Sequence, residues 1–210
     1  AWSGFTDLTG FPDTKPSGPA SAYSDAVGGM AGAQAVLLAL IRRARTGHGQ
    51  WIDVSQMEAM SALLGPLALE LSANGNDVQR TGNRLPHGGG APHGAYRCKG
   101  DDRWLAITVF TDDEWAAFVG VLGSPDWALG LRFASVESRL SHADDLDRLV
   151  ESWTAEQNAE EAMHLLQAAG VAAGVVQTGQ DMAENDPHLR ERRIFQKVPD
   201  ASGTSRIIER

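Results

Sequence analysis

The sequence predicts an α/β protein with more helix than strand, on three observations. Apolar residues recur at helical spacing in stretches that end at turn residues, namely 26–45, 56–73, 111–122, 141–153 and 158–169. Short runs rich in β-branched and aromatic residues lie among them, namely 50–55, 95–99, 103–110, 171–177 and 194–198. Residues 74–94 are rich in glycine and polar residues and sustain no regular element, so they form the best internal boundary.

The first helix is predicted over residues 26–45, after loops in residues 1–22 that hold at most one short strand. Ser24 or Asp25 is expected to cap its first turn, arginines fill its last turn, and Gly47 lies just beyond its end. Its apolar residues cover most of the circumference, which predicts a helix that is buried on several sides.

The remaining elements follow from turn and cap signals. A strand at residues 50–55 leads into the second helix, which Pro66 is expected to kink or break. Turn residues 100–102 join the two strands of a predicted hairpin, and Thr111 with Glu114 forms the pattern of a capping box. Residues 126–138 are predicted to be irregular with apolar anchors, and short helical turns are predicted at 181–184 and 187–193.

Composition narrows the class of partner and compartment. A net charge of −9 and a pI near 5.1 argue against nucleic acid as the main partner, because such binding rests on clustered lysine and arginine. Cys98 is the only cysteine, so no intrachain disulfide can form and a reducing compartment is expected. The longest apolar run, Ala31 to Ile41, is too short to span a bilayer, and no signal-peptide pattern is found.

Several common catalytic motifs are missing from the sequence. It contains no GxxxxGK[ST] phosphate loop, no GxGxxG after a strand, no HExxH, no CxxC and no GxSxG. These absences remove the usual sequence support for nucleotide-binding, zinc-dependent and serine-hydrolase functions.

Three glycines and one aspartate are the candidates for chemistry. Asp25 precedes an apolar helical stretch, where it can cap the helix or react at its end. Gly88, Gly89 and Gly90 form either a plain flexible linker or a loop whose backbone N–H groups approach a ligand and close over it.

Histidines flank the three glycines. His87 and His93 make a weak metal candidate, since the usual third and fourth ligands are missing, and the alternative is two solvated loop residues. No metal is therefore expected.

The frame YSDAVGG…LLALIRRARTGHGQWIDVSQMEA, residues 23–59, resembles the family III CoA-transferases, the formyl-CoA and crotonobetainyl-CoA:carnitine CoA-transferase group. Further matches follow in the same order, namely RTGNRLP, GAYRCKGDDRWLAITVFTDDEWAAFVGVLG, AAGVAAGVV and NDPHLRERRIF. The resemblance covers almost the whole chain, and TGHGQWIDVS is its most specific part.

The resemblance implies a covalent mechanism in which Asp25 occupies the position of the nucleophile. A carboxylate attacks an acyl-CoA thioester, and an aspartyl anhydride and then an aspartyl-CoA thioester form before the acceptor acid reverses the sequence. Gly88, Gly89 and Gly90 stand where the family has a loop that closes over the site. Coenzyme A takes part as a thioester substrate, and no further cofactor is implied.

The resemblance also assigns the domains. It implies part of a Rossmann-like large domain with the catalytic-aspartate helix in residues 1–75, a glycine-rich linker in 76–94, a small α+β domain in 95–195, and the start of a return to the large domain in 196–210. It further implies that an N-terminal half with most of the coenzyme A contacts precedes Ala1, and that the return continues past Arg210.

Two alternatives stay open. The α-methylacyl-CoA racemases are close relatives of the family and also carry an aspartate at this helix start, but Thr111 falls where they carry a glutamate, which favours the transferase. The chain could also be a non-catalytic piece that another chain completes. The resemblance implies an interlocked homodimer that acts on an acyl-CoA and a carboxylic acid. The single cysteine, the acidic balance and the short apolar run predict a cytoplasmic protein with no nucleic acid or membrane as partner.

Overall fold

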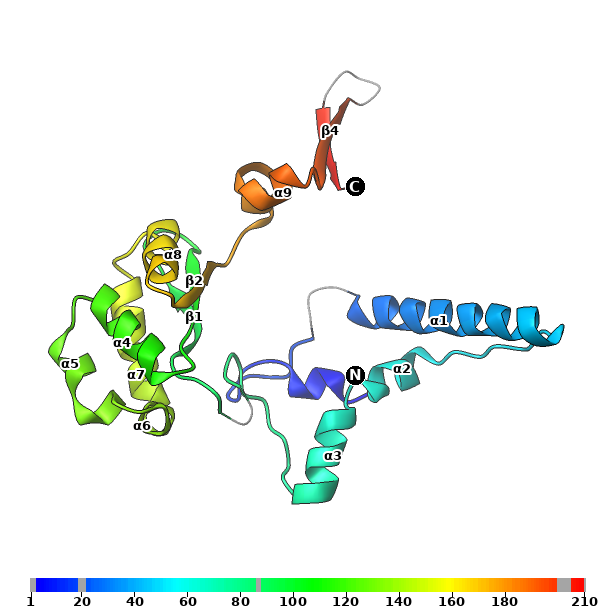
Figure 1. Cartoon of the computed structure of the whole chain (residues 1–210), viewed down its shortest axis with the longest axis horizontal. Coiled ribbons are helices and arrows are strands. Elements are labelled where there is room, and N and C mark those ends of the chain that lie inside the picture. Colours follow the sequence, from blue (N-terminus) through cyan, green and yellow to red (C-terminus); the bar gives the residue numbers. More distant parts are fainter. Residues whose placement is uncertain (1–2, 19–21, 86–87, 200–204, 210) are drawn as a thin grey trace. The chain divides into compact units, whose positions relative to one another are not determined.

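The chain divides into two compact units, residues 1–87 and 88–210, and each is described here by itself. The computed structural model describes residues 3–18, 22–85, 88–199 and 205–209. Helices and short strands together confirm the predicted α/β class (Figure 1). The boundary between the units falls inside the predicted linker, residues 76–94. The assignment of residues 1–75, 95–195 and 196–210 to large and small domains stays a prediction.

The first unit is helical in the residues that the structure describes. Its elements are the 3-10 turn η1 (Phe5–Leu8) and the helices α1 (Tyr23–Thr46), α2 (Gln56–Ala62) and α3 (Gly65–Asn74). The predicted first helix is confirmed as α1, and Gly47 ends it with a φ of 76° while its N–H donates to the carbonyl of Arg43. Pro66 lies at the start of α3, so the predicted break in the second helix is also confirmed.

Two local predictions in this unit are wrong. The residue that precedes α1 is Ala22, which makes no side-chain cap, and Asp25 lies inside the first turn rather than at the cap position. Residues 50–55 form no strand, because no other described segment of the chain offers them a backbone partner.

The first unit has little core of its own. Met60 is the only buried residue among those described in this unit, and α1 has none. Met30, Leu37 and Leu38 of α1 are each at least 60% exposed, so the expectation of a helix buried on several sides is wrong for this chain alone. By length and composition α1 could also cross a membrane, a test that core helices of soluble proteins pass as well.

The second unit contains the remaining elements. Its strands are β1 (His93–Arg97), β2 (Trp104–Thr108), β3 (Ala172–Val175), β4 (Phe195–Pro199) and β5 (Ser205–Glu209). Its helices are α4 (Asp112–Val121), α5 (Asp126–Leu129), η2 (Leu131–Phe133), α6 (Val136–Ser141), α7 (Ala143–Thr154), α8 (Ala159–Ala168), the π-helical turn η3 (Asp181–Asn185) and α9 (Pro187–Glu191). The predicted hairpin, capping box and amphipathic helices are confirmed.

An antiparallel sheet in the order β1-β2-β3 carries the core of this unit. Alternate residues of β2 face opposite sides, and Leu105 and Ile107 are buried with at most 1% of their surface exposed. Helices α7 and α8 contact the sheet, and Phe118, Leu146 and Leu166 complete the cluster (Figure 1). This unit therefore buries an apolar core within its own residues.

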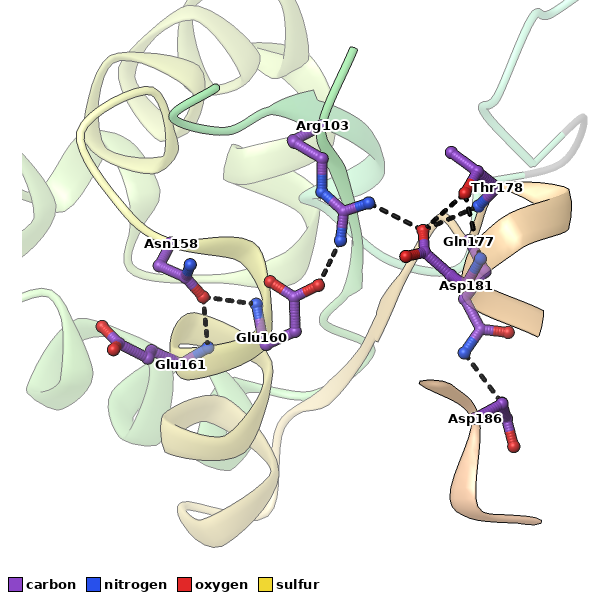
Figure 2. Close-up of polar contacts among 8 residues, drawn as sticks. All are labelled: Arg103, Asn158, Glu160, Glu161, Gln177, Thr178, Asp181 and Asp186. Carbon is purple, nitrogen blue, oxygen red and sulfur yellow. Dashed lines mark hydrogen bonds and ion pairs between the residues drawn. The ribbon is translucent and has the colours of Figure 1, made fainter. Parts of the chain in front are cut away.

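One polar network joins the segment that follows β3 to other parts of the second unit. Figure 2 shows the guanidinium of Arg103 between the carboxylates of Glu160 and Asp181, with 2.7 Å between Nη1 of Arg103 and Oδ2 of Asp181. The same Asp181 oxygen accepts from the backbone N–H of Thr178 at 3.0 Å and from its hydroxyl at 2.9 Å. The segment after β3 is thus held by its side chains to the β1–β2 hairpin and to the start of α8.

Candidate active site

Asp25 lies in the first turn of α1, and its side chain is exposed. The first four N–H groups of an α-helix have no partner within the helix and carry partial positive charge. A carboxylate at this place is close to those N–H groups and open to a reagent. The position therefore suits a nucleophile whose negative charge is kept near the helix end.

Gln56 binds this carboxylate from a second helix. Its Nε2 donates a hydrogen bond of 2.6 Å to Oδ1 of Asp25 across 31 positions of sequence. Gln56 is the first residue of α2, and the hydroxyl of Ser55 caps that helix by accepting from the N–H of Glu58 at 3.2 Å. The cap fixes where α2 begins, and so places the Gln56 side chain against the first turn of α1.

Gly28 makes room for Gln56. A Cβ at position 28 would lie 2.9 Å from Cγ of Gln56, closer than real contacts allow. A Cβ at Gly29 or Gly32 would meet nothing within 4 Å. Glycine at position 28 therefore lets the Gln56 side chain lie where it does, whereas the other two glycines make no such contact.

The TGHGQ turn, residues 46–50, reverses the chain after α1. Nη1 of Arg42 donates to the carbonyl of Gly49 at 3.2 Å and to Oε1 of Gln50 at 3.1 Å. The hydroxyl of Thr46 donates to the carbonyl of Arg42 at 2.9 Å. These contacts hold the turn between α1 and residues 51–55, which lead into α2.

The three glycines begin the second unit and differ from one another. Gly88 and Gly89 are exposed, and Gly88 has a φ of 63° that other residues rarely adopt. Gly90 is buried, and a Cβ there would lie 2.4 Å from the carbonyl oxygen of Val109. The loop is therefore anchored at its last glycine and open at its first two.

Arg139 holds the chain directly after the glycines. It is fully buried, and its Nε donates to the carbonyl of Ala91 at 2.8 Å. Its other nitrogens donate to the carbonyls of Phe133 at 3.2 Å and Thr111 at 3.3 Å, and Nη1 lies 3.0 Å from Oδ1 of Asp112. Burial lowers the pKa of Arg139, and the hydrogen bond to Asp112 opposes that shift.

No group of three or more histidine, cysteine or carboxylate side chains that could hold a metal ion is found among the described residues. His87 lies outside the described residues. His93 is in β1, where its ring makes an edge contact with Phe110 at 6.4 Å between ring centres. The structure thus adds no ligand to the weak metal candidate of the sequence.

Asp25 and the three glycines belong to different units, and the structure describes each within its own unit. Two neighbours of these residues are missing from the sequence prediction, Gln56 and Arg139. Gln56 follows a serine cap and could have been suspected only once α1 and α2 were known to touch. Arg139 carries no sequence signal, because a charged residue in an amphipathic stretch is normally expected at the surface.

Comparison with known proteins places this chain among the coenzyme A transferases. It belongs to CoA-transferase family III, whose model matches residues 1–209. The structure also resembles a CAIB/BAIF family protein from Brucella suis, with a TM-score of 0.83 and 28% identity over 99% of this chain and 56% of that one.

Curated relatives carry the same class of activity in their names. The chain is 37% identical over 176 residues to a probable CoA-transferase of Mycobacterium tuberculosis. The aligned region covers 84% of this chain and 22% of that protein. It is 32% identical over 200 residues to the succinyl-CoA–D-citramalate CoA-transferase of Chloroflexus aurantiacus, covering 95% and 49%. The acetyl-CoA:oxalate CoA-transferase of Acetobacter aceti is also 32% identical, with coverages of 94% and 50%. The chain thus spans half or less of the length of these relatives.

Proposed function

We propose that this chain is part of an enzyme that moves coenzyme A from an acyl-CoA donor to a carboxylic-acid acceptor, with Asp25 as the covalent nucleophile. The observation that carries the proposal is the family match over residues 1–209 together with an exposed carboxylate in the first turn of α1. Asp25 stands in the position where the family's nucleophile is expected.

The chemistry consists of four acyl exchanges. An Asp25 oxygen adds to the thioester carbonyl, the C–S bond breaks, and coenzyme A leaves as thiolate, which gives a mixed anhydride of Asp25 and the donor acid. The thiolate attacks Cγ of Asp25 and releases the donor acid, which leaves an aspartyl-CoA thioester. The acceptor carboxylate then attacks Cγ and expels the thiolate, which gives a second mixed anhydride. The thiolate attacks the acyl carbonyl of the acceptor in that anhydride, and Asp25 leaves as the free carboxylate. Each exchange is easier than a direct transfer between two acids.

A mixed anhydride is hydrolysed by water, so such an enzyme gains from a loop that excludes solvent. We assign this role to Gly88, Gly89 and Gly90. Support comes from the open first two glycines and the fixed third, an arrangement that allows the loop to move about a defined end. The expected partner is a second copy in an interlocked homodimer, and the expected location is the cytoplasm.

The acceptor is proposed to be a small dicarboxylic acid. Relatives of this chain are named for transfer to D-citramalate, mesaconate, L-malate and oxalate, and all of these acids carry two carboxylates. Succinyl-CoA and acetyl-CoA are accordingly the first donors to test.

The racemase alternative is less well supported, because the named relatives are CoA-transferases. Thr111 caps α4, where its hydroxyl accepts from the N–H of Glu114 at 3.1 Å, and so has a structural duty. A racemase would exchange the α-proton of a 2-methylacyl-CoA with deuterated water in the absence of an acceptor acid. The transferase proposal expects no such exchange.

The proposal is tested by replacing Asp25 with asparagine in the natural protein that contains these residues. Transfer of coenzyme A to the acceptor should fall by at least about 10³-fold, because the amide cannot form the anhydride. Asp13→Asn removes another exposed carboxylate of the first unit and serves as the matched control. Full turnover in the Asp25→Asn variant would overturn the proposal.

A further inference from the structure

We propose that Gln56 is a catalytic residue, whose side-chain amide stabilises the charge that develops on Oδ1 of Asp25 when Cγ is attacked. The inference rests on the proposed function, since it assigns a role at the same nucleophile. It starts from the 2.6 Å hydrogen bond between Nε2 of Gln56 and Oδ1 of Asp25.

The hydrogen bond makes the two carboxylate oxygens unequal. Oδ1 is occupied by the Gln56 amide, so Oδ2 is the oxygen left to attack the thioester carbonyl. In the anhydride that follows, Oδ2 becomes the bridging oxygen and Oδ1 remains the carbonyl oxygen of the aspartyl half. The amide is thus already placed on the oxygen that the next step will charge.

Two of the four exchanges take place at Cγ. When thiolate adds to Cγ of the anhydride, Oδ1 takes the negative charge, and the Cγ–Oδ2 bond then breaks to release the donor acid with Oδ2. When the acceptor carboxylate adds to Cγ of the thioester, Oδ1 again takes the charge before thiolate leaves. A donor that is already aligned on such an oxygen lowers the barrier, as side-chain amides do in other acyl-transfer sites.

The surroundings of Gln56 fit this role better than that of a simple tie between helices. Gln56 and Asp25 are both exposed, where water competes for their hydrogen bond and reduces what the bond contributes to folding. Nevertheless position 28 has to be glycine for the side chain to lie where it does, at a cost in helix stability. The Ser55 cap fixes the start of α2 and so the place from which the amide reaches Asp25.

An amide is also the suitable donor for this oxygen. It donates without being able to give up its proton at neutral pH, so it cannot protonate Asp25 and remove its nucleophilic charge. A lysine or arginine in the same place would hold both oxygens more strongly and reduce the reactivity of Oδ2.

The test measures formation of the aspartyl-CoA thioester in the natural protein that contains these residues. The enzyme is mixed with succinyl-CoA without acceptor, quenched with acid at increasing times, and the coenzyme A adduct on Asp25 is followed by mass spectrometry. Gln56→Met keeps the length of the side chain and removes its donor. We expect the adduct to form about 10²–10³-fold more slowly, and kcat to fall by a similar factor.

The matched control is Gln79→Met. Gln79 is an exposed glutamine of the same unit, and its Nε2 donates to the carboxylate of Asp77 at 2.8 Å, so the substitution removes the same kind of contact elsewhere. Its rate should equal that of the wild type. A general loss of packing would instead raise KM or lower stability, and KM for succinyl-CoA is expected to change less than about threefold in Gln56→Met.

The outcomes separate the two proposals. If the wild type forms the adduct and Gln56→Met forms it at the same rate, the role of Gln56 is refuted while the nucleophile stands. If the wild type forms no adduct on Asp25, the proposed function itself is refuted. A slow adduct in Gln56→Met, with Gln79→Met unaffected, supports the inference.

Discussion

The side-chain amide of Gln56 donates to Oδ1 of Asp25 across 2.6 Å, and so joins the starts of α1 and α2. This contact gives the carboxylate a defined orientation in a unit that otherwise buries almost nothing. It also makes Asp25 more than a negative charge near a helix end, because one of its oxygens is held and the other is left for reaction.

Substitution at Gly28 should break this contact without touching either residue. A Cβ there would lie 2.9 Å from Cγ of Gln56, so Gly28→Ala should displace the glutamine. Gly29→Ala meets nothing within 4 Å and is the matched control. The side-chain amide resonances of Gln56, followed by NMR while Asp25 is titrated, should respond in Gly29→Ala and lose that response in Gly28→Ala. An unchanged response in both variants would show that Gly28 has no such role.

Gly90 should tolerate no side chain. Its Cβ would lie 2.4 Å from the backbone oxygen of Val109, which cannot turn away as a flexible side chain can. Gly90→Ala should therefore destabilise the second unit by about 1–3 kcal/mol in urea unfolding. Gly120→Ala, at an exposed position in the last turn of α4 with nothing within 4 Å of the new Cβ, should stabilise it by up to about 1 kcal/mol. Equal stability of the two variants would contradict the close approach at Gly90.

Arg139 should be needed to hold the chain directly after Gly90 in place. Arg139→Met leaves the carbonyls of Ala91 and Phe133 without their donor, and should reduce the free energy of unfolding by about 2–4 kcal/mol. Arg139→Lys keeps a donor and a charge and should lose less. Tryptophan fluorescence in urea measures both, since the guanidinium lies 5.0 Å from the ring centre of Trp115. A Met variant as stable as the wild type would refute this assignment.

The Arg103 network should weaken in acid. The backbone N–H of Thr178, and then Arg103 and the Thr178 hydroxyl, lower the pKa of Asp181 far below its usual range. A carboxylate with a lowered pKa contributes stability that is fully present above its unfolded pKa of about 3.9 and is lost as the pH falls towards the folded value. The wild type should therefore be more stable than Asp181→Asn by a constant amount from pH 7 to 5, and by less below about pH 4.

Thermal unfolding across this pH range measures the difference between the two proteins, which removes the effect of other carboxylates. Asp101→Asn, in the turn between β1 and β2, is the control. A difference for Asp181→Asn that does not change with pH would mean that the carboxylate charge is not what holds the network.

Much of the fold could be predicted from local sequence. The apolar pattern before Gly47 predicts α1, and the Thr111–Glu114 pair predicts the start of α4, because each signal lies within one turn or one helix. The predicted strand at residues 50–55 fails for the opposite reason. A strand exists only if a second segment pairs with it, and this requirement is invisible in six residues of sequence.

The candidate site likewise has one part that local sequence predicts and another that depends on tertiary contacts. The position of Asp25 at a helix start was open to prediction from the pattern around it, whereas its bond to Gln56 depends on how two helices meet. The burial of Arg139 depends on carbonyls from three separate segments, which include those of Ala91 and Phe133. Both contacts belong to tertiary structure and leave no local trace.

The most direct test of the proposed mechanism is to identify the residue that carries coenzyme A during turnover. The natural protein that contains these residues is incubated with succinyl-CoA, quenched in acid, digested and analysed by mass spectrometry, with Asp25→Asn treated alongside. The account predicts a coenzyme A adduct on the peptide that carries Asp25, lost in the variant and discharged when a dicarboxylate acceptor is added. Transfer without any adduct on Asp25, or an adduct that persists in Asp25→Asn, would contradict it.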